Sequence, residues 1–201
     1  MDHPTLHYRQ LIFGLWLAWV LYWVVSAFGV KTARRRESRA SRLSHVLPLA
    51  VGVTLIGWPH LHQVGWLSRP LLPPSAWRFG GALALTAAGL AFTVWARLHI
   101  GRNWSGTVTL KEGHELIRSG PYAWVRHPIY TGLLVALLGG AVACGEWRAL
   151  IGLALVAGAF VRKLRIEEHF MRESFPDEYP RYCAQVPALI PFTASRRSAP
   201  R

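Results

Sequence analysis

Long apolar stretches alternate with short polar ones along the chain, which is the pattern of a helical membrane protein. Residues 11–30 carry no formal charge, and a helix of that length is enough to cross a hydrocarbon core of about 30 Å. Residues 46–58 and 79–97 are two further apolar segments. We therefore predict three membrane spans in an N-terminal region, residues 1–98.

A helical hairpin is predicted for residues 129–161. Its two apolar arms are separated only by Glu146-Trp147-Arg148, so they should be antiparallel neighbours. The second arm, residues 149–161, is short for a span, so we expect it to tilt, to thin the bilayer locally or to continue as a helix beyond the membrane. Small residues that would let the two arms approach closely are Gly132, Gly139, Gly140, Gly152 and Gly158.

The predicted fold class is all-α: a polytopic integral membrane protein with about five transmembrane helices and a cytoplasmic C-terminal site in residues 99–201. The formal charge of +13 would also fit a nucleic-acid-binding protein. The basic residues, however, lie between apolar runs instead of along one polar face, and 19 of the 23 fall in segments on one side of the predicted topology. Because cytoplasmic loops are enriched in Lys and Arg, we expect the N-terminus outside, the C-terminus in the cytoplasm, and no nucleic-acid partner.

Cysteine and histidine spacing does not favour a metal site or a disulfide framework. Cys144 and Cys183 lie in different segments, with no second cysteine or histidine at ligand spacing. We expect no metal.

Ionisable residues gather at the start of the first hairpin arm, in the stretch Gly120 to Gly132 (Gly-Pro-Tyr-Ala-Trp-Val-Arg-His-Pro-Ile-Tyr-Thr-Gly). Such groups are costly at a membrane helix unless they face a partner, a cavity or a ligand. Proline is favoured at the first helical position, so a helix should begin at Pro128 with His127 near its N-cap. Together with Arg126, the helix start would suit a carboxylate or a phosphate. The alternative is that Arg126 and His127 only anchor the helix at the head groups.

Glu167 and Glu168 follow the second arm directly. They could pair locally, Glu167 with Lys163 and Glu168 with Arg172, at helical spacing. A short hairpin also brings its two cytoplasmic ends together, so the acids should lie at the level of the Arg-His-Pro sequence. A pocket with a positive helix end on one wall and two carboxylates on the other would suit a zwitterionic ligand.

Three blocks resemble the C-terminal half of the isoprenylcysteine carboxyl methyltransferase family, within a wider group of small membrane methyltransferases that includes phospholipid N-methyltransferases. They are Gly-Arg-Asn-Trp-Ser-Gly at 101–106, the stretch 120–132, and the acidic pair followed by Phe175, Tyr179, Tyr182 and Val186-Pro187-Ala188-Leu189-Ile190-Pro191. The resemblance implies methyl transfer from S-adenosylmethionine to a lipid-like or prenylated substrate reaching the site from the bilayer. It also implies a cofactor site made of His114, Leu116, Ile117, Tyr122, His127, Pro128, Tyr130, Glu167 and Glu168.

A carboxylate acceptor is already ionised near neutral pH and needs no general base. Arginine is the natural residue to orient it, so Arg126, Arg162 and Arg165 are candidates for binding the substrate's acid group. An amine or a small thiol as acceptor stays open, and so does a non-catalytic membrane scaffold or lipid-binding protein with the same fold. The bias towards alanine, arginine and tryptophan is compatible with a bacterial inner-membrane protein.

Overall fold

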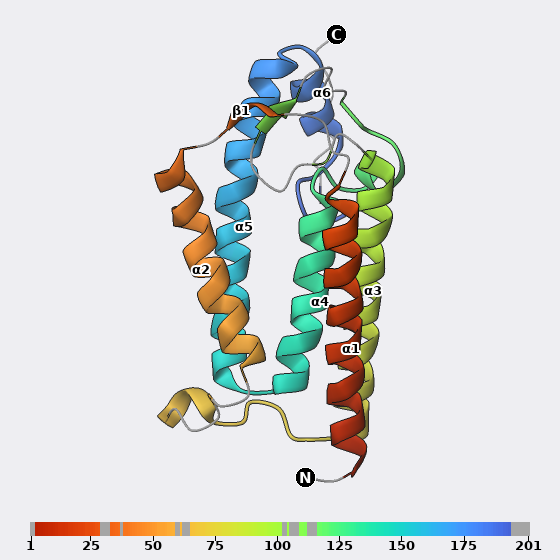
Figure 1. Ribbon diagram of the computed structural model, residues 1–201, viewed down its shortest axis with the longest axis vertical. Helices are drawn as coiled ribbons and strands as arrows, with labels where there is room; N and C mark the ends of the chain where they lie inside the picture. The colour runs from red at the N-terminus through yellow and green to blue at the C-terminus, as the bar shows by residue number, and fades with distance from the viewer. Residues whose placement is uncertain are drawn as a thin grey trace.

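The computed structural model describes residues 3–28, 33–36, 38–58, 61, 65–101, 104, 109–111 and 116–193. Within them the regular secondary structure is helical apart from one two-stranded antiparallel ladder (Figure 1). The elements are α1 (His3–Ser26), β1 (Ala33–Arg36), α2 (Arg39–Gly57), α3 (Ala76–Ile100), β2 (Thr109–Lys111), α4 (Pro128–Cys144), α5 (Trp147–Ser174) and α6 (Glu178–Gln185). The predicted helical membrane class is confirmed, and the ladder between β1 and β2 was not predicted.

Three of the described helices are long and apolar enough to cross a membrane: residues His7–Ser26 of α1, α2 and α3. Helix α4 is a shorter apolar helix of 17 residues, about 26 Å long. Helix α5, with 28 residues, runs beside α2 and extends towards α6 at its end (Figure 1). Length and composition therefore support three of the five predicted spans.

The helix boundaries differ from the predicted segments in three places. Helix α1 ends at Ser26 and not at residue 30. Helix α2 begins at Arg39, because Ser38 caps it by accepting a hydrogen bond from the Ser41 N–H (3.2 Å), and Pro48 lies inside the helix. The second hairpin arm continues to Ser174 as one helix, the last of the three predicted alternatives.

Glycines bring the helices together in pairs, but not in the predicted way. A Cβ on Gly89 of α3 would lie 2.4 Å from the Ala136 backbone nitrogen of α4, and one on Gly132 would lie 2.6 Å from the Gly89 carbonyl oxygen. A Cβ on Gly152 of α5 would lie 2.5 Å from the carbonyl oxygen of Gly52 in α2. Four of the five hairpin glycines thus pack outwards on α3 and α2, a Cβ on Gly158 would meet nothing within 4 Å, and the prediction that these glycines join the two arms was wrong.

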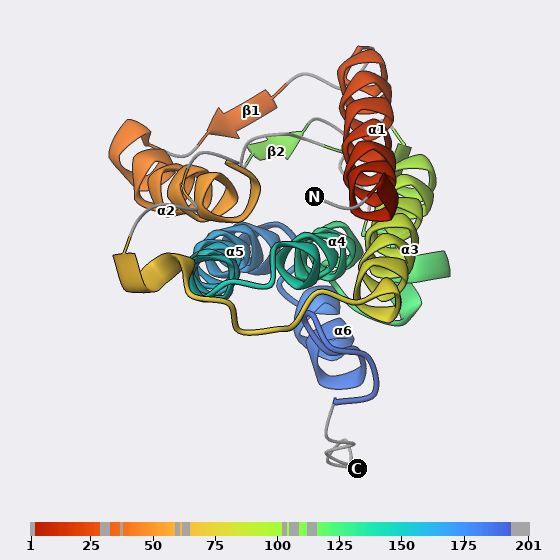
Figure 2. The ribbon, with the colours of Figure 1, turned by 90° about the horizontal axis from the view of Figure 1, so that it is seen from below.

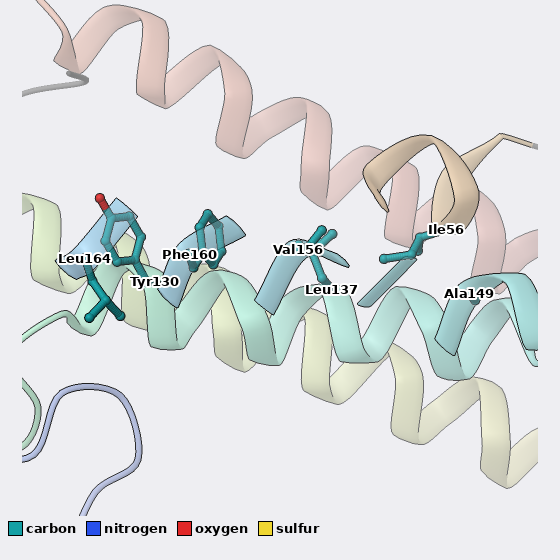
Figure 3. Close-up of a cluster of buried hydrophobic side chains, with 7 residues drawn as sticks. All are labelled: Ile56, Tyr130, Leu137, Ala149, Val156, Phe160 and Leu164. Carbon is teal, nitrogen blue, oxygen red and sulfur yellow. The ribbon is translucent and has the colours of Figure 1, made fainter. Parts of the chain in front are cut away.

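Viewed along the helices, α3, α4 and α5 form one row, while α1 and α2 lie on the same side of that row at its two ends (Figure 2). A cluster of buried side chains joins α2, α4 and α5: Ile56, Tyr130, Leu137, Ala149, Val156, Phe160 and Leu164 (Figure 3). In this cluster the Tyr130 and Phe160 rings stack with centroids 4.9 Å apart. Tyr130 is thereby held in the core at the end of α4 that carries the ionisable residues.

Candidate functional site

Helix α4 begins as the sequence predicts, with His127 as N-cap and Pro128 as the first helical residue. It is preceded by a short 3₁₀ turn, η4 (Gly120–Ala123). Gly120 enters this turn at φ +58°, and a Cβ there would also lie 2.7 Å from the His99 ring. Pro121 and Tyr122 of this turn are buried, so packing as well as proline fixes the path of the chain into α4.

Four side chains from α5 and the start of α4 form one ion cluster. The Arg126 guanidinium donates to Glu168 Oε1 from Nη2 (2.6 Å) and from Nε (3.0 Å). His127 Nε2 lies 3.3 Å from the same oxygen, and His127 Nδ1 lies 3.6 Å from Glu167 Oε2. Glu167 also accepts a hydrogen bond from the Tyr130 hydroxyl (2.5 Å). The predicted juxtaposition of the helix start and the acidic pair is therefore a direct contact.

The two locally predicted pairs are present as well. Glu168 Oε2 accepts from Arg172 at 3.2 Å, and Lys163 Nζ lies 4.0 Å from Glu167. Local pairing and pairing across the hairpin thus coexist.

The cluster sets the charge states of its members. Burial disfavours the charged form of Glu168, but hydrogen bonds from His127 and Arg126 outweigh burial and lower its pKa to about 2. The pKa of Glu167 is also lowered, because the bond with His127 and the charge of Lys163 outweigh its burial. Burial opposes a charge on His127, yet its bonds to both glutamates raise its pKa. These shifts favour two carboxylates, one guanidinium and a protonated imidazole in the cluster.

Helix α6 and the tail that follows it, residues 186–193, hold the segment before α4 in place through hydrogen bonds. The backbone N–H groups of Arg126 and His127 donate to the carbonyls of Pro187 (2.8 Å) and Ala188 (3.0 Å). Arg126 Nη1 donates to the Val186 carbonyl. The carbonyl of Tyr122 accepts from the hydroxyl of Tyr182 (2.6 Å), which is 3% exposed.

A cavity of about 1020 Å³ extends from this cluster along α4 between α1 and α2. Its polar end is lined by Tyr122, Arg126, His127, Lys163 and Glu167. Most side chains that line the rest are apolar, although Arg9 and Arg148 also line it; the apolar ones include Trp16, Trp19 and Trp23 of α1, Leu49 and Val53 of α2, and Leu133 and Leu137 of α4. One continuous space therefore joins a charged end to an apolar channel beside membrane-spanning helices.

Comparison with known proteins finds similarity to isoprenylcysteine methyltransferases. The model of the isoprenylcysteine carboxyl methyltransferase family matches residues 82–173, which contain most of the site. Protein-S-isoprenylcysteine O-methyltransferase B of Arabidopsis thaliana is 28% identical over 141 residues, covering 69% of this chain and 66% of the relative. The human protein-S-isoprenylcysteine O-methyltransferase is 30% identical over 140 residues, covering 68% of this chain and 45% of the relative.

Over residues 82–173 the chain is therefore similar to the isoprenylcysteine carboxyl methyltransferase family. It spans between about half and two thirds of the length of these relatives. A solved structure of the eukaryotic intramembrane Ras methyltransferase ICMT is similar with a TM-score of 0.49 and 24% identity, covering 79% of this chain and 53% of that chain.

Most of the residues that the family resemblance singles out lie together in the structure. Seven of them line the cavity with Arg126: Leu116, Ile117, Tyr122, His127, Pro128, Tyr130 and Glu167. Glu168 binds Arg126 and His127 directly, with a side chain only 8% exposed. His114 lies outside the described residues.

Two of the predicted arginines are not brought to the cavity. Arg162 and Arg165 are exposed and line a separate shallow depression on α5, where Arg162 donates to the hydroxyl of Ser44. Arg126 is at the cavity, but Glu168 and tail carbonyls occupy its guanidinium.

Sequence reasoning missed two sets of cavity residues. Lys163 lines the cavity, and its spacing to Phe160 and Glu167 puts all three on one face of a helix, a signal that separates it from Arg162 and Arg165. Trp16, Trp19 and Trp23 recur every three or four residues, which is the spacing of one helical stripe.

Proposed function

We propose that the chain is a member of the isoprenylcysteine carboxyl methyltransferase family, a membrane methyltransferase that uses S-adenosylmethionine to methylate the carboxylate of a lipid-modified, isoprenylcysteine-like substrate. The observation that carries the proposal is the cavity, which joins a paired acid and base cluster to a long apolar channel. The polar end suits a zwitterionic methyl donor, and the channel suits the hydrocarbon chain of an acceptor.

The residues at the polar end fit the donor's chemistry. Glu167 offers carboxylate oxygens to an amine or to ribose hydroxyls, while Leu116 and Ile117 offer apolar contact at the cavity wall. Glu168 contacts Arg126 and His127 in the adjoining ion cluster. The first N–H groups of α4, after Pro128, have no acceptor within their own helix and favour a carboxylate. We assign the cofactor site to these residues with His114, Tyr122, His127 and Tyr130.

The charge states in the cluster favour a carboxylate acceptor over an amine or a thiol. An ammonium group or a thiol must first lose a proton to a base. Glu168 has a pKa of about 2 and the pKa of Glu167 is lowered, so both are weak bases; the raised pKa of His127 favours its protonated form, which cannot accept a proton. Burial raises the pKa of Tyr122 and Tyr182 as well. A carboxylate needs no base, because its oxygen already carries the electron pair that forms the new bond.

When bound, S-adenosylmethionine would supply a methyl group on a cationic sulfur, and transfer of that group to a carboxylate oxygen would form a C–O bond, break the C–S bond and move no proton. The protein's contribution is then to align the acceptor and to exclude water. The cavity walls provide both: apolar side chains hold the lipid chain, and the ion cluster fixes the charged end.

The location we propose is the bacterial inner membrane, with the N-terminus outside and the cofactor site on the cytoplasmic side. The distribution of basic residues supports this orientation. Two exposed tryptophans of α3, Trp77 and Trp95, are separated by about 27 Å of helix, which matches the thickness of a hydrocarbon core between two aromatic belts. In this orientation the acidic pair lies near the cytoplasmic interface.

The test is to incubate membranes containing the protein with labelled S-adenosylmethionine and either a farnesylated cysteine analogue or phosphatidylethanolamine. We expect label in the cysteine analogue. Label in the phospholipid alone would replace the proposal by N-methylation. Absence of S-adenosylhomocysteine binding to folded protein in calorimetry would instead favour a scaffold.

A further inference from the structure

The cations at the polar end of the cavity differ in how many of their donors are already used. Arg126 directs Nε and Nη2 to Glu168 and Nη1 to the carbonyls of Cys183 and Val186. Both ring nitrogens of His127 face glutamate oxygens. Arg126 thus has four of its five N–H donors engaged within the protein, and both ring nitrogens of His127 face the acidic pair.

Lys163 is the exception among the described cavity cations at this end. Its Nζ lies 4.0 Å from Glu167 Oε1, beyond hydrogen-bonding distance, and that oxygen already accepts the Tyr130 hydroxyl. The ammonium also lies 5.4 Å from the centroid of the Tyr130 ring. Its side chain is 18% exposed. Electrostatic attraction therefore holds Lys163 near the cluster, and the N–H groups of its ammonium remain available to a ligand.

The charges at this end leave Lys163 without a full counter-charge. Glu167 and Glu168 are faced by three permanent cations, Arg126, Arg172 and Lys163, in addition to His127, so the cations outnumber the carboxylates. The Lys163 ammonium adds one positive charge to a cavity wall whose continuation is apolar. An unbalanced charge in such a place is costly unless a ligand compensates it, and one carboxylate compensates it.

Helix α5 separates this lysine from its basic neighbours. Phe160, Lys163 and Glu167 line the cavity, whereas Arg162 and Arg165 line the depression outside it. A substrate whose chain lies in the channel can therefore meet Lys163 but not the two arginines.

We propose that Lys163 binds and orients the carboxylate of the acceptor, a role that rests on the proposed function and adds a specificity residue to it. The lysine holds the acid group at the junction of the apolar channel and the ion cluster. An acceptor with a neutral group in place of the carboxylate loses this contact.

The experiment compares Lys163→Met with Arg165→Gln, which removes the same charge from the outer face of the same helix. The KM for the farnesylated cysteine analogue and the affinity for S-adenosylhomocysteine are measured in both, and the analogue's carboxamide is tested as a competitive inhibitor. A lost charge-assisted hydrogen bond predicts a KM increase of about 10- to 100-fold in Lys163→Met, with unchanged S-adenosylhomocysteine affinity. The wild-type preference for carboxylate over carboxamide should disappear in Lys163→Met and persist in Lys163→Arg and in Arg165→Gln.

An unchanged KM and an unchanged preference in Lys163→Met, in protein that still binds S-adenosylhomocysteine, would overturn the role of Lys163. So would a larger effect of Arg165→Gln than of Lys163→Met. A wild-type protein that binds S-adenosylhomocysteine but does not methylate the analogue would instead overturn the proposed function, so the two failures are distinguishable.

Discussion

The guanidinium of Arg126 lies 2.6 Å from the carboxylate of Glu168, and the two side chains are only 11% and 8% exposed. This pair links the loop before α4 to the cytoplasmic end of α5 under the proposed orientation. Because Arg126 also donates to tail carbonyls, one side chain joins three segments that are distant in sequence. The cluster is thus structural support for the site as well as part of its wall.

Removing one member of this buried pair should destabilise the protein strongly. Arg126→Gln leaves the Glu168 charge partly unpaired, at a cost of about 3–5 kcal/mol for a buried ion pair. Arg118→Gln is the control, because the Arg118–Glu178 pair is 50% and 55% exposed and such pairs contribute at most about 1 kcal/mol. Thermal unfolding in detergent should show a much larger drop in melting temperature for Arg126→Gln. Equal drops in the two variants would contradict the structural role of the pair.

The cofactor assignment predicts a loss of binding without a loss of membrane insertion. We expect His127→Ala and Glu168→Ala each to abolish S-adenosylhomocysteine binding in calorimetry while the protein stays in the membrane fraction. His169→Ala is a matched control, since its side chain is 67% exposed and pairs only with Glu173 in the described contacts. Affinity retained in both cluster variants would remove these residues from the site.

Stability should depend on pH through His127. Its pKa is raised in the folded state above an unfolded value of about 6.5. The ion pairs with Glu167 and Glu168 therefore contribute fully below pH 6.5 and are lost as pH rises through the folded-state pKa. The melting temperature should fall above about pH 6.5 in the wild type and fall less in His127→Gln; parallel pH profiles would refute this linkage.

The loss of folding stability at acid pH should come from Glu168. Its pKa of about 2 lies below an unfolded value of about 4.3, so its contribution is present above that value and is lost as pH falls towards 2. Glu168→Gln should flatten the wild-type loss of stability in this range.

The close contact of α3 and α4 predicts that Gly89 tolerates no side chain. A Cβ at Gly89 would lie 2.4 Å from a backbone nitrogen, so Gly89→Ala must separate the two helices. Gly81→Ala in the same helix meets nothing within 4 Å and should be neutral or stabilise by up to about 1 kcal/mol through helix propensity. Melting temperatures of the two variants test this, and a neutral Gly89→Ala would show that the interface is loose.

The start of α4 and its contact with Glu167 and Glu168 could be predicted from the sequence, because both depend on local rules. Proline at position 128 favours the first helical residue, and a short hairpin brings its ends together. The helical membrane class followed from the length of the apolar runs for the same reason.

Other features depend on tertiary packing and could not be predicted locally. The glycines of residues 129–161 permit close approach to any neighbour, and only the structure shows that the neighbours are α3 and α2. Helix α2 begins at Arg39, ahead of the predicted segment 46–58, and continues through Pro48, although proline removes a helical hydrogen bond. The sequence predicts that Arg126 binds the acid group of a substrate, whereas in the structure Arg126 binds Glu168. That contact depends on tertiary packing.

The kind of bond that joins the transferred methyl group to the acceptor tests the central claim most directly. Product made from labelled S-adenosylmethionine and the farnesylated cysteine analogue is treated with mild base, which hydrolyses a methyl ester but not an N-methyl or S-methyl group. We predict that the label is released as methanol and that His127→Ala yields no labelled product. Label that stays on the acceptor after base treatment would contradict carboxylate methylation.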